Sequence, residues 1–255
     1  MRLIDTHAHL DLEQYDHDRQ EVCSRAASDL EAVINVGISA KTTAECLRLS
    51  RQYANFYTAV GIHPNNAEEY TEEDWKIIVQ LAHDPKAIAI GETGFDLFHG
   101  VSLERQRELF IKHLQLAHSL DKPLIIHCRA AASELTNFLR QRQNEHTLPD
   151  GVVHCFTEDI ETAERYLRMG FYIALGGVVT FKQATALVPM VKYIPAERLL
   201  LETDCPFLAP QVFRGQRNEP SYIIETAKII AQIRGVNLEE LTEQTTQNSR
   251  RLFKI

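Results

Sequence analysis

Short apolar runs rich in isoleucine, valine and leucine recur along the whole chain. A short continuous apolar run bounded by turn-forming residues is typical of a buried strand. Eight such runs occur, at residues 3–5, 32–37, 56–61, 87–91, 124–127, 152–154, 172–176 and 199–202. The pattern therefore predicts eight strands, separated by segments long enough to form helices.

The segments between these runs show helical periodicity. One stripe of residues 103–120 carries Leu103, Phe110, Leu114 and Ala117. Ser102 directly precedes this segment and predicts a helix N-cap, and Thr71, followed by three acidic residues, predicts the start of a helix that ends near His83. Strands and helices thus alternate along the chain.

Continuously apolar strands that alternate with helices predict a parallel sheet covered by helices. Eight such units in 255 residues suit an α/β fold of the closed (β/α)8 TIM-barrel type, with residues 1–255 forming one domain. A doubly wound open sheet is the alternative architecture with the same alternation.

His7 and His9 are the first candidates for chemistry. Side chains at positions i and i+2 of a strand point to the same face, so two imidazoles with this spacing can bind one ion. Two surface histidines near the end of a strand would give the same local sequence. The pair is therefore informative only together with the polar residues that end the other strands.

Polar residues that can bind metal follow most of the predicted strands at their carboxyl ends. They are Asp5 with His7 and His9, His63, Glu92, His127, His154, and Glu202 with Asp204. In a (β/α)8 barrel these ends converge on one mouth, so residues far apart in sequence become neighbours. A single histidine there would more often be a buried structural residue, but this whole set at one end predicts a site for one or two ions.

Composition restricts the class of protein. No apolar run approaches the roughly 20 residues of a membrane span, and the first residues lack the apolar segment of a signal peptide. Five cysteines without paired spacing favour a reducing compartment, so we expect a cytoplasmic enzyme with no membrane partner. The net charge of -8 gives no general attraction for nucleic acid, so any phosphate binding must be local.

Taken in order, these motifs resemble the TatD-type metal-dependent deoxyribonucleases, a branch of the amidohydrolase superfamily with a (β/α)8 barrel. The resemblance covers practically the whole chain. Its motifs include Asp5-Thr6-His7-Ala8-His9-Leu10, Gly61-Ile62-His63-Pro64, Gly91-Glu92-Thr93-Gly94, Val153-His154-Cys155-Phe156 and Glu202-Thr203-Asp204-Cys205-Pro206. It implies a hydrolase that cleaves phosphodiester bonds in DNA at a divalent metal centre.

Position by position, the resemblance implies a specific set of ligands. They are His7, His9, Glu92, His127, His154 and Asp204. Imidazoles and carboxylates suit Zn²⁺ and Mn²⁺, and carboxylates with water also admit Mg²⁺. We expect two divalent ions bridged by Glu92, one held by His7, His9 and Asp204 and the other by His127 and His154.

Two further roles follow from this interpretation. Asp204 is the candidate for orienting the attacking water and accepting its proton, although it could serve only as a ligand. His63 could contact a phosphate oxygen or the leaving group, or could only support the ligands. Arg129, Lys182 and Arg214 are candidates to bind substrate phosphates from loops around the mouth, with solvated surface charge as the alternative.

The chain departs from the usual family pattern at residues 95–99, at Ala130 and at residues 157–159, where Glu158 and Asp159 add negative charge. The first two departures bear on substrate preference rather than on metal binding or hydrolysis, and the added negative charge at residues 157–159 predicts weaker polynucleotide binding. The favoured hypothesis is a 3′-5′ exonuclease on single-stranded DNA, with no obligate protein partner. The alternatives are a hydrolase of a small amide, lactone or aminoacyl ester, and a binding protein that retains the fold without catalysis.

Overall fold

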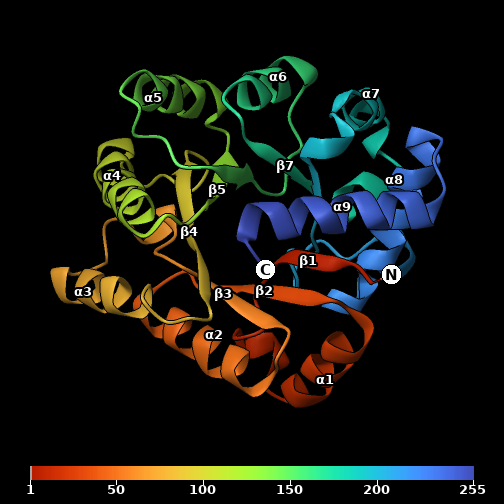
Figure 1. Cartoon of the computed structure of the whole chain (residues 1–255), viewed down its shortest axis with the longest axis horizontal. Helices are drawn as coiled ribbons and strands as arrows, with labels where there is room; N and C mark the ends of the chain where they lie inside the picture. The colour runs from red at the N-terminus through yellow and green to blue at the C-terminus, as the bar shows by residue number, and fades with distance from the viewer. Residues whose placement is uncertain (1) are drawn as a thin grey trace.

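The computed structural model describes residues 2–255. A sheet of eight parallel strands forms its centre, and each strand pairs with the next one in sequence (Figure 1). The strands are β1 (Ile4–Ala8), β2 (Ala32–Val36), β3 (Phe56–Val60), β4 (Ala87–Asp96), β5 (Leu124–Arg129), β6 (Gly151–Val153), β7 (Tyr172–Leu175) and β8 (Leu199–Leu201).

The sheet closes on itself where the segment after β8 meets β1. Ala8 and Cys205 form a parallel bridge, and the hydroxyl of Thr6 donates to the carbonyl of Leu201 at 3.0 Å. Sequential strand order with this closure confirms the predicted (β/α)8 barrel. It excludes the doubly wound sheet, in which the strand order reverses.

Helices surround the barrel on its outer side and cross one of its ends (Figure 1). They are α1 (Arg19–Asp29), α2 (Ala40–Gln52), α3 (Glu72–Leu81), α4 (Leu103–Leu120), α5 (Ala132–Asn144), α6 (Ile160–Arg168), α7 (Val188–Tyr193), α8 (Ile223–Arg234) and α9 (Leu238–Phe253). Both predicted N-caps are confirmed, because Thr71 accepts from the amide of Asp74 and Ser102 from that of Arg105. Within residues 2–255, no helix has the length and apolar character needed to cross a membrane.

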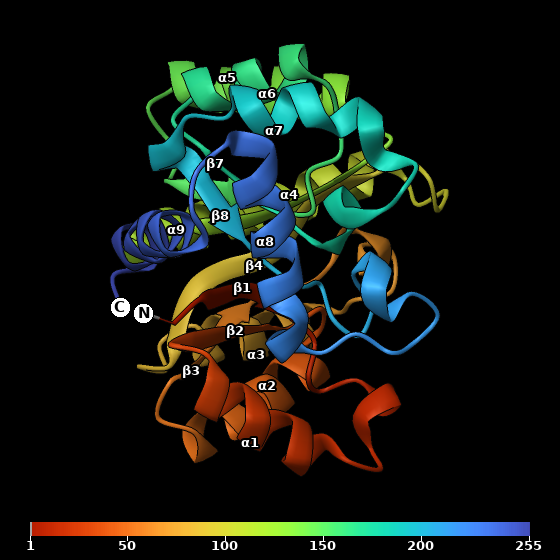
Figure 2. The same cartoon turned by 90° about the vertical axis from the view of Figure 1, so that its right-hand side faces the viewer.

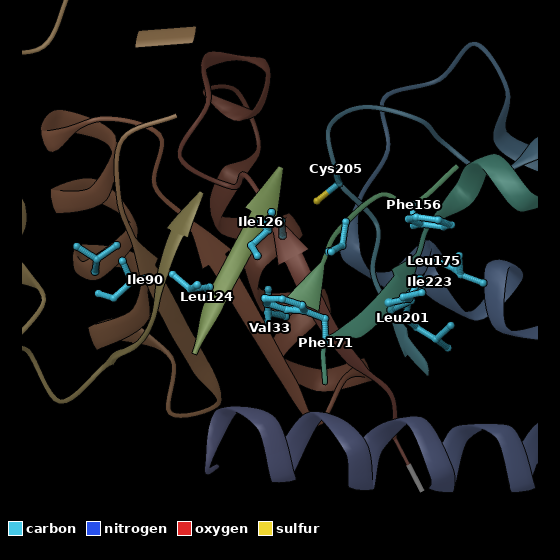
Figure 3. Close-up of a cluster of buried hydrophobic side chains, with 14 of the residues drawn as sticks. Val33, Ile90, Leu124, Ile126, Phe156, Phe171, Leu175, Leu201, Cys205 and Ile223 are labelled. Atoms are coloured by element: carbon cyan, nitrogen blue, oxygen red, sulfur yellow. The ribbon is translucent and has the colours of Figure 1, made fainter. Parts of the chain in front are cut away.

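The strands are buried on both faces, as their continuous apolar runs predict. In β5, Leu124 and Ile126 point into the layer between strands and helices, which Figure 3 shows in part. Ile125, between them, belongs to a second cluster inside the barrel with residues of β2, β3, β4, β6, β7 and β8. The two-residue period of the strand therefore fills two separate cores.

Helix α9 covers the amino end of the barrel. It lies across the strand ends in Figure 1 and beside β1 and β8 in Figure 2. Leu252 and Phe253, near its end, are buried in the inner cluster against residues such as Ile34 and Leu200. One end of the barrel is thus sealed by apolar side chains, which leaves the carboxyl end for polar groups.

Strand β4 continues five residues beyond its predicted end at Gly91, to Asp96. Two glycines, one at the predicted end and one within the extension, explain why the sequence resembles a turn. A Cβ on Gly91 would lie 2.5 Å from the carbonyl oxygen of Ile125, and one on Gly94 would lie 2.1 Å from that of His127. Glycine is therefore required for β4 to approach β5 closely, and this approach carries Glu92 and Asp96 into the mouth of the barrel.

Candidate active site

A cavity of about 580 Å³ opens at the carboxyl end of the barrel. Residues from loops and strands on all sides line it, including His9, His63, Glu92, His127, His154 and Asp204. His7 lies below them and is fully buried. The structure thus brings together all six residues predicted to bind metal, with His63 beside them.

Three of these residues form one group. His7 lies in β1 and His9 directly follows that strand, and their Nε2 atoms lie 3.0 Å apart. Oδ1 of Asp204 lies 3.5 Å from Nε2 of His9 and 3.9 Å from Nε2 of His7. The amide of Asp204 donates to the carbonyl of His7 at 2.9 Å, so the closure of the barrel fixes this group.

A second group surrounds Glu92. Its Oε1 lies 2.8 Å from Nδ1 of His127, 2.8 Å from Nε2 of His154 and 3.4 Å from Nε2 of His63. These residues come from four different strands or from the turns that directly follow them. His63, Glu92 and His127 have the spacing of residues that could hold a metal ion, as do His7, His9 and Asp204.

Glu92 connects the two groups. While its Oε1 faces His127 and His154, its Oε2 lies 3.3 Å from Nε2 of His7 and 3.7 Å from Nε2 of His9. Each carboxylate oxygen therefore faces one set of imidazoles. This is the geometry expected of a carboxylate that bridges two cations.

Hydrogen bonds assign the proton on three of the rings. Nδ1 of His9 lies 2.9 Å from the carbonyl oxygen of Val36, which can only accept, so Nδ1 carries a proton and Nε2 is the nitrogen left to bind an ion. His127 presents the other ring nitrogen to the site, because its Nε2 lies 3.2 Å from Asp96 and its Nδ1 faces Glu92. Nδ1 of His63 instead accepts from the amide of Asn65, which leaves the proton on Nε2. His9 and His127 are thus oriented as ligands and His63 as a donor.

Electrostatics also suit a cation. Burial acts to raise the pKa of Glu92, but the surrounding imidazoles, that of His154 foremost, hold this pKa well below its usual range. Burial acts to lower the pKa of His9, yet the hydrogen bond to Asp204 and the charge of Glu92 raise it to about 9. The carboxylates therefore remain ionised and draw positive charge to the cluster, which divalent ions would supply equally well.

Asp96 was not predicted as a site residue. It is fully buried at the end of β4 and accepts from the ring of His127 and, at 2.8 Å, from that of His99. These contacts and the backbone amide of His99 hold the pKa of Asp96 well below its usual range, although burial opposes them. The only signal in the sequence was an acid four residues after Glu92, which has no meaning until β4 is known to extend that far.

Beneath the metal-binding groups lie two more buried acids. Asp5 accepts from the amide of His7 and from the amide and hydroxyl of Thr203, and burial still raises its pKa to about 8. Glu202 accepts from the amide of Cys155 at 2.6 Å. Both residues end predicted strands, but the sequence did not indicate that they support the ligands from below.

The three candidate phosphate-binding residues are not equivalent. Arg129 lines the cavity, and its guanidinium carbon lies 4.2 Å from the ring centre of Phe98. Lys182 and Arg214 lie outside this lining, on the loops that follow β7 and β8, and Arg214 stacks on Phe181 at 4.0 Å. Their contacts with phosphate stay predictions.

Comparisons with known proteins agree with the fold and the site. Residues 4–254 match the model of a family described as "TatD related DNase". The chain belongs to this family. The chain is also similar to the "Uncharacterized metal-dependent hydrolase YabD" of Bacillus subtilis, to which it is 42% identical over 99% of both chains.

A second TatD relative, from a Rahnella strain, is named "3'-5' ssDNA/RNA exonuclease TatD"; it is 34% identical over 95% of this chain and 94% of its own length. Among solved structures, the TatD homologue YjjV of Escherichia coli superposes with a TM-score of 0.92 at 30% identity, over 100% of this chain and 98% of that one. An organophosphorus hydrolase, with 16% identity and a TM-score of 0.68, shares the fold. The TatD assignment therefore rests on sequence and structure over the whole length.

Proposed function

We propose that this protein is a metal-dependent hydrolase that removes nucleotides from the 3′ end of single-stranded DNA. The observation that carries the proposal is Glu92, whose two oxygens face two separate groups of imidazoles. A carboxylate in this position suits two divalent ions a few ångströms apart, the arrangement that phosphodiester hydrolysis uses. The family name and the exonuclease-named relative support DNA as the substrate.

His7, His9 and Asp204 would hold one ion, His127 and His154 the other, and Glu92 would bridge them. Such ions, whether Mg²⁺, Mn²⁺ or Zn²⁺, lower the pKa of a bound water and neutralise charge on the attacking and leaving oxygens. The protein fixes the positions of the ligands through the closure of the barrel and through the hydrogen bonds of His9 and His127 to Val36 and Asp96.

Asp204 is the proposed proton acceptor. Its side chain is 14% exposed and borders the cavity, and the hydrogen bond to His9 helps to hold its pKa below the usual value although burial opposes this. It therefore stays ionised at neutral pH, able to orient the attacking water and to take its proton.

His63 is the proposed donor on the other side of Glu92. Because its Nδ1 accepts from Asn65, its Nε2 carries a proton and lies 3.4 Å from Oε1 of Glu92 at the wall of the cavity. A donor there can stabilise the charge that develops on a phosphate oxygen or on the leaving oxygen.

The cavity offers contacts suited to a single strand. Arg129, which makes no salt bridge in the described part of the chain, is steadied by the face of Phe98 and keeps its in-plane donors for a phosphate. Phe207 lines the cavity beside His9 and is 46% exposed, so it can stack on a base. Lys182 and Arg214 would contact phosphates farther along the strand.

The test is hydrolysis by metal-loaded protein of single-stranded DNA labelled at either end, with RNA and duplex DNA in parallel. We expect a ladder shortened from the 3′ end, dependent on Mg²⁺, Mn²⁺ or Zn²⁺ and abolished by a chelator. Small amide, lactone and aminoacyl ester substrates form the second arm. Turnover of an acyl substrate with no cleavage of DNA would overturn the proposal in favour of acyl hydrolysis on the same barrel.

A further inference from the structure

The four histidines proposed as ligands differ in what their second ring nitrogen contacts. Val36 accepts from His9, and Asp96 accepts from His127. Nδ1 of His7 and Nδ1 of His154 are both buried and make no hydrogen bond to any of residues 2–255. Histidines that bind metal almost always donate this second N–H to a carboxylate, a carbonyl or a water, so these two need an acceptor.

The two unpaired nitrogens lie on the same side of the site. The rings of His7 and His154 stack with centroids 3.8 Å apart and planes 11° from parallel. Both Nε2 atoms face Glu92, at 3.3 Å and 2.8 Å. In stacked rings that share this orientation, both Nδ1 atoms point away from Glu92. They face the buried region beneath the metal-binding groups, which we call the floor of the site.

Glu202 lies at that floor. Its Oε1 is 3.6 Å from Nδ1 of His154, too far for a good hydrogen bond, and already accepts from the amide of Cys155 at 2.6 Å. Its Oε2 is buried and has no partner within the described chain. One ligand atom from each of Glu202, His7 and His154 lies within 4.8 Å of the other two. The three residues, from β1 and from the segments after β6 and β8, therefore meet at one place, and each carries a buried side-chain atom without a partner in the described chain.

The protonation of these groups decides what can bind between them. If Nε2 of His7 and of His154 directs its lone pair at an ion, each Nδ1 must carry the proton. The floor then presents two N–H donors and one carboxylate oxygen. A water molecule satisfies all three by accepting twice and donating once, whereas a cation would face two N–H groups.

We propose that Glu202 is a positioning residue, which through one bound water holds His7 and His154 with the proton on Nδ1 and the lone pair of Nε2 directed at the metal centre. This inference rests on the proposed role of His7 and His154 as ligands. It concerns metal binding alone and does not depend on which substrate is hydrolysed.

The decisive variant is Glu202→Gln, which preserves shape. The single amide oxygen would remain with the amide of Cys155, so the NH₂ group would replace Oε2 and present a third donor to the water. One imidazole would then have to move its proton from Nδ1 to Nε2 and lose its lone pair for the ion. We expect Zn²⁺ to bind about 10 to 100 times more weakly, as measured by competition with a chelator.

Glu219→Gln is the matched control, because Glu219 is also a buried carboxylate but bonds Arg25 instead of a histidine. It should bind Zn²⁺ as the unmodified protein does, with folding of both variants checked by thermal unfolding. Equal Zn²⁺ affinity in folded Glu202→Gln and unmodified protein would overturn the proposal. If the protein binds Zn²⁺ and Glu202→Gln weakens it, but no DNA is cleaved, the inference stands and the proposed substrate fails.

A spectroscopic measurement on unmodified protein keeps the test independent of any variant. Long-range ¹H–¹⁵N spectra of Zn²⁺-loaded, ¹⁵N-histidine-labelled protein distinguish protonated Nδ1 from protonated Nε2. We expect His7 and His154 to carry the proton on Nδ1, and a high-resolution crystal structure to contain one water between them and Glu202. A proton on Nε2 of either ring, or a cation at the water position, would contradict the proposal.

Discussion

Asp96 holds the ring of His127 from the side opposite Glu92, with Oδ2 of Asp96 3.2 Å from Nε2 of His127 and Oε1 of Glu92 2.8 Å from its Nδ1. The imidazole thus lies between two carboxylates. Its orientation is set by the extension of β4, which supplies both acids.

Replacing Asp96 by Asn should selectively weaken one ion. The amide would present a donor to a ring nitrogen that already donates, so His127 would lose its fixed orientation while His7, His9 and Asp204 remain in place. We expect the affinity of the ion near His127 to fall about 10- to 100-fold. Calorimetric titration with Zn²⁺ or Mn²⁺ should resolve one weakened and one intact site, and two unchanged sites would disprove this role.

Glu92→Ala should have the largest effect on metal content. Removal of the bridging carboxylate leaves both ions without their shared negative charge, so the occupancy of at least one should fall and activity should collapse. Elemental analysis after gel filtration, together with DNA hydrolysis on the same preparation, measures both. Full metal content with unchanged turnover would show that Glu92 is not a bridge.

Asp204→Asn separates proton transfer from metal binding. The amide keeps the size and one oxygen ligand but cannot accept a proton, so turnover should fall about 10²-fold or more. Metal content should fall much less. If metal and activity are lost in parallel and both return with excess Mn²⁺, then Asp204 is a ligand only.

His63→Ala should lower turnover without emptying the site, because His63 is oriented as a donor and the other residues suffice for two ions. Metal content measured beside kcat distinguishes this from the loss of a ligand. His118→Ala, an exposed histidine near the end of α4, is the control for histidine removal. Loss of an ion in His63→Ala but not in His118→Ala would show that His63 is a metal ligand.

Stability should fall in mild acid because of His113, a buried residue of α4. Burial lowers its pKa from 6.5 to about 4, although its hydrogen bond to Leu109 opposes this. Between these values the unfolded chain binds one more proton than the folded one, so the stabilisation is complete above pH 6.5 and is lost as the pH falls toward 4. From this group alone the free energy of unfolding should decrease by about 3 kcal/mol across that range.

Urea denaturation of metal-free protein at pH 7.5, 6 and 4.5 tests this expectation, with His113→Gln as the comparison. Because glutamine does not titrate, the difference in unfolding free energy between the two proteins should shrink as the pH falls. A difference that stays constant with pH would mean that His113 does not cause the acid sensitivity.

The positions of the strands could be predicted because each strand is buried on both faces and therefore leaves an uninterrupted apolar run. The candidate ligands could be recognised as part of a larger group because polar residues follow those runs and the barrel brings strand ends together. The resemblance to TatD proteins implied which six of these residues bind metal, but not which ring nitrogen of each histidine faces the site. His9 and His127 present different nitrogens, and only the positions of Val36 and Asp96 decide this.

Supporting residues were harder to predict for the same reason. Asp96 reaches His127 only because Gly91 and Gly94 let β4 continue beside β5. Glu202 directly follows β8, which ends at Leu201. Its position beneath the site therefore depends on the backbone turns after the strand and not on an apolar pattern. The sequence therefore does not reveal how side chains are oriented where the two-residue period of a strand ends.

Closure of the barrel between β1 and the segment after β8 has a consequence for how the protein is made. At about 5 to 20 residues per second, a ribosome needs roughly 10 to 40 seconds to proceed from residue 8 to residue 205. During that time β1 has no partner along one edge, and an unpaired parallel strand invites association with neighbouring nascent chains. Chaperones that bind the emerging chain would therefore matter most in this interval, before His7 and Asp204 can meet.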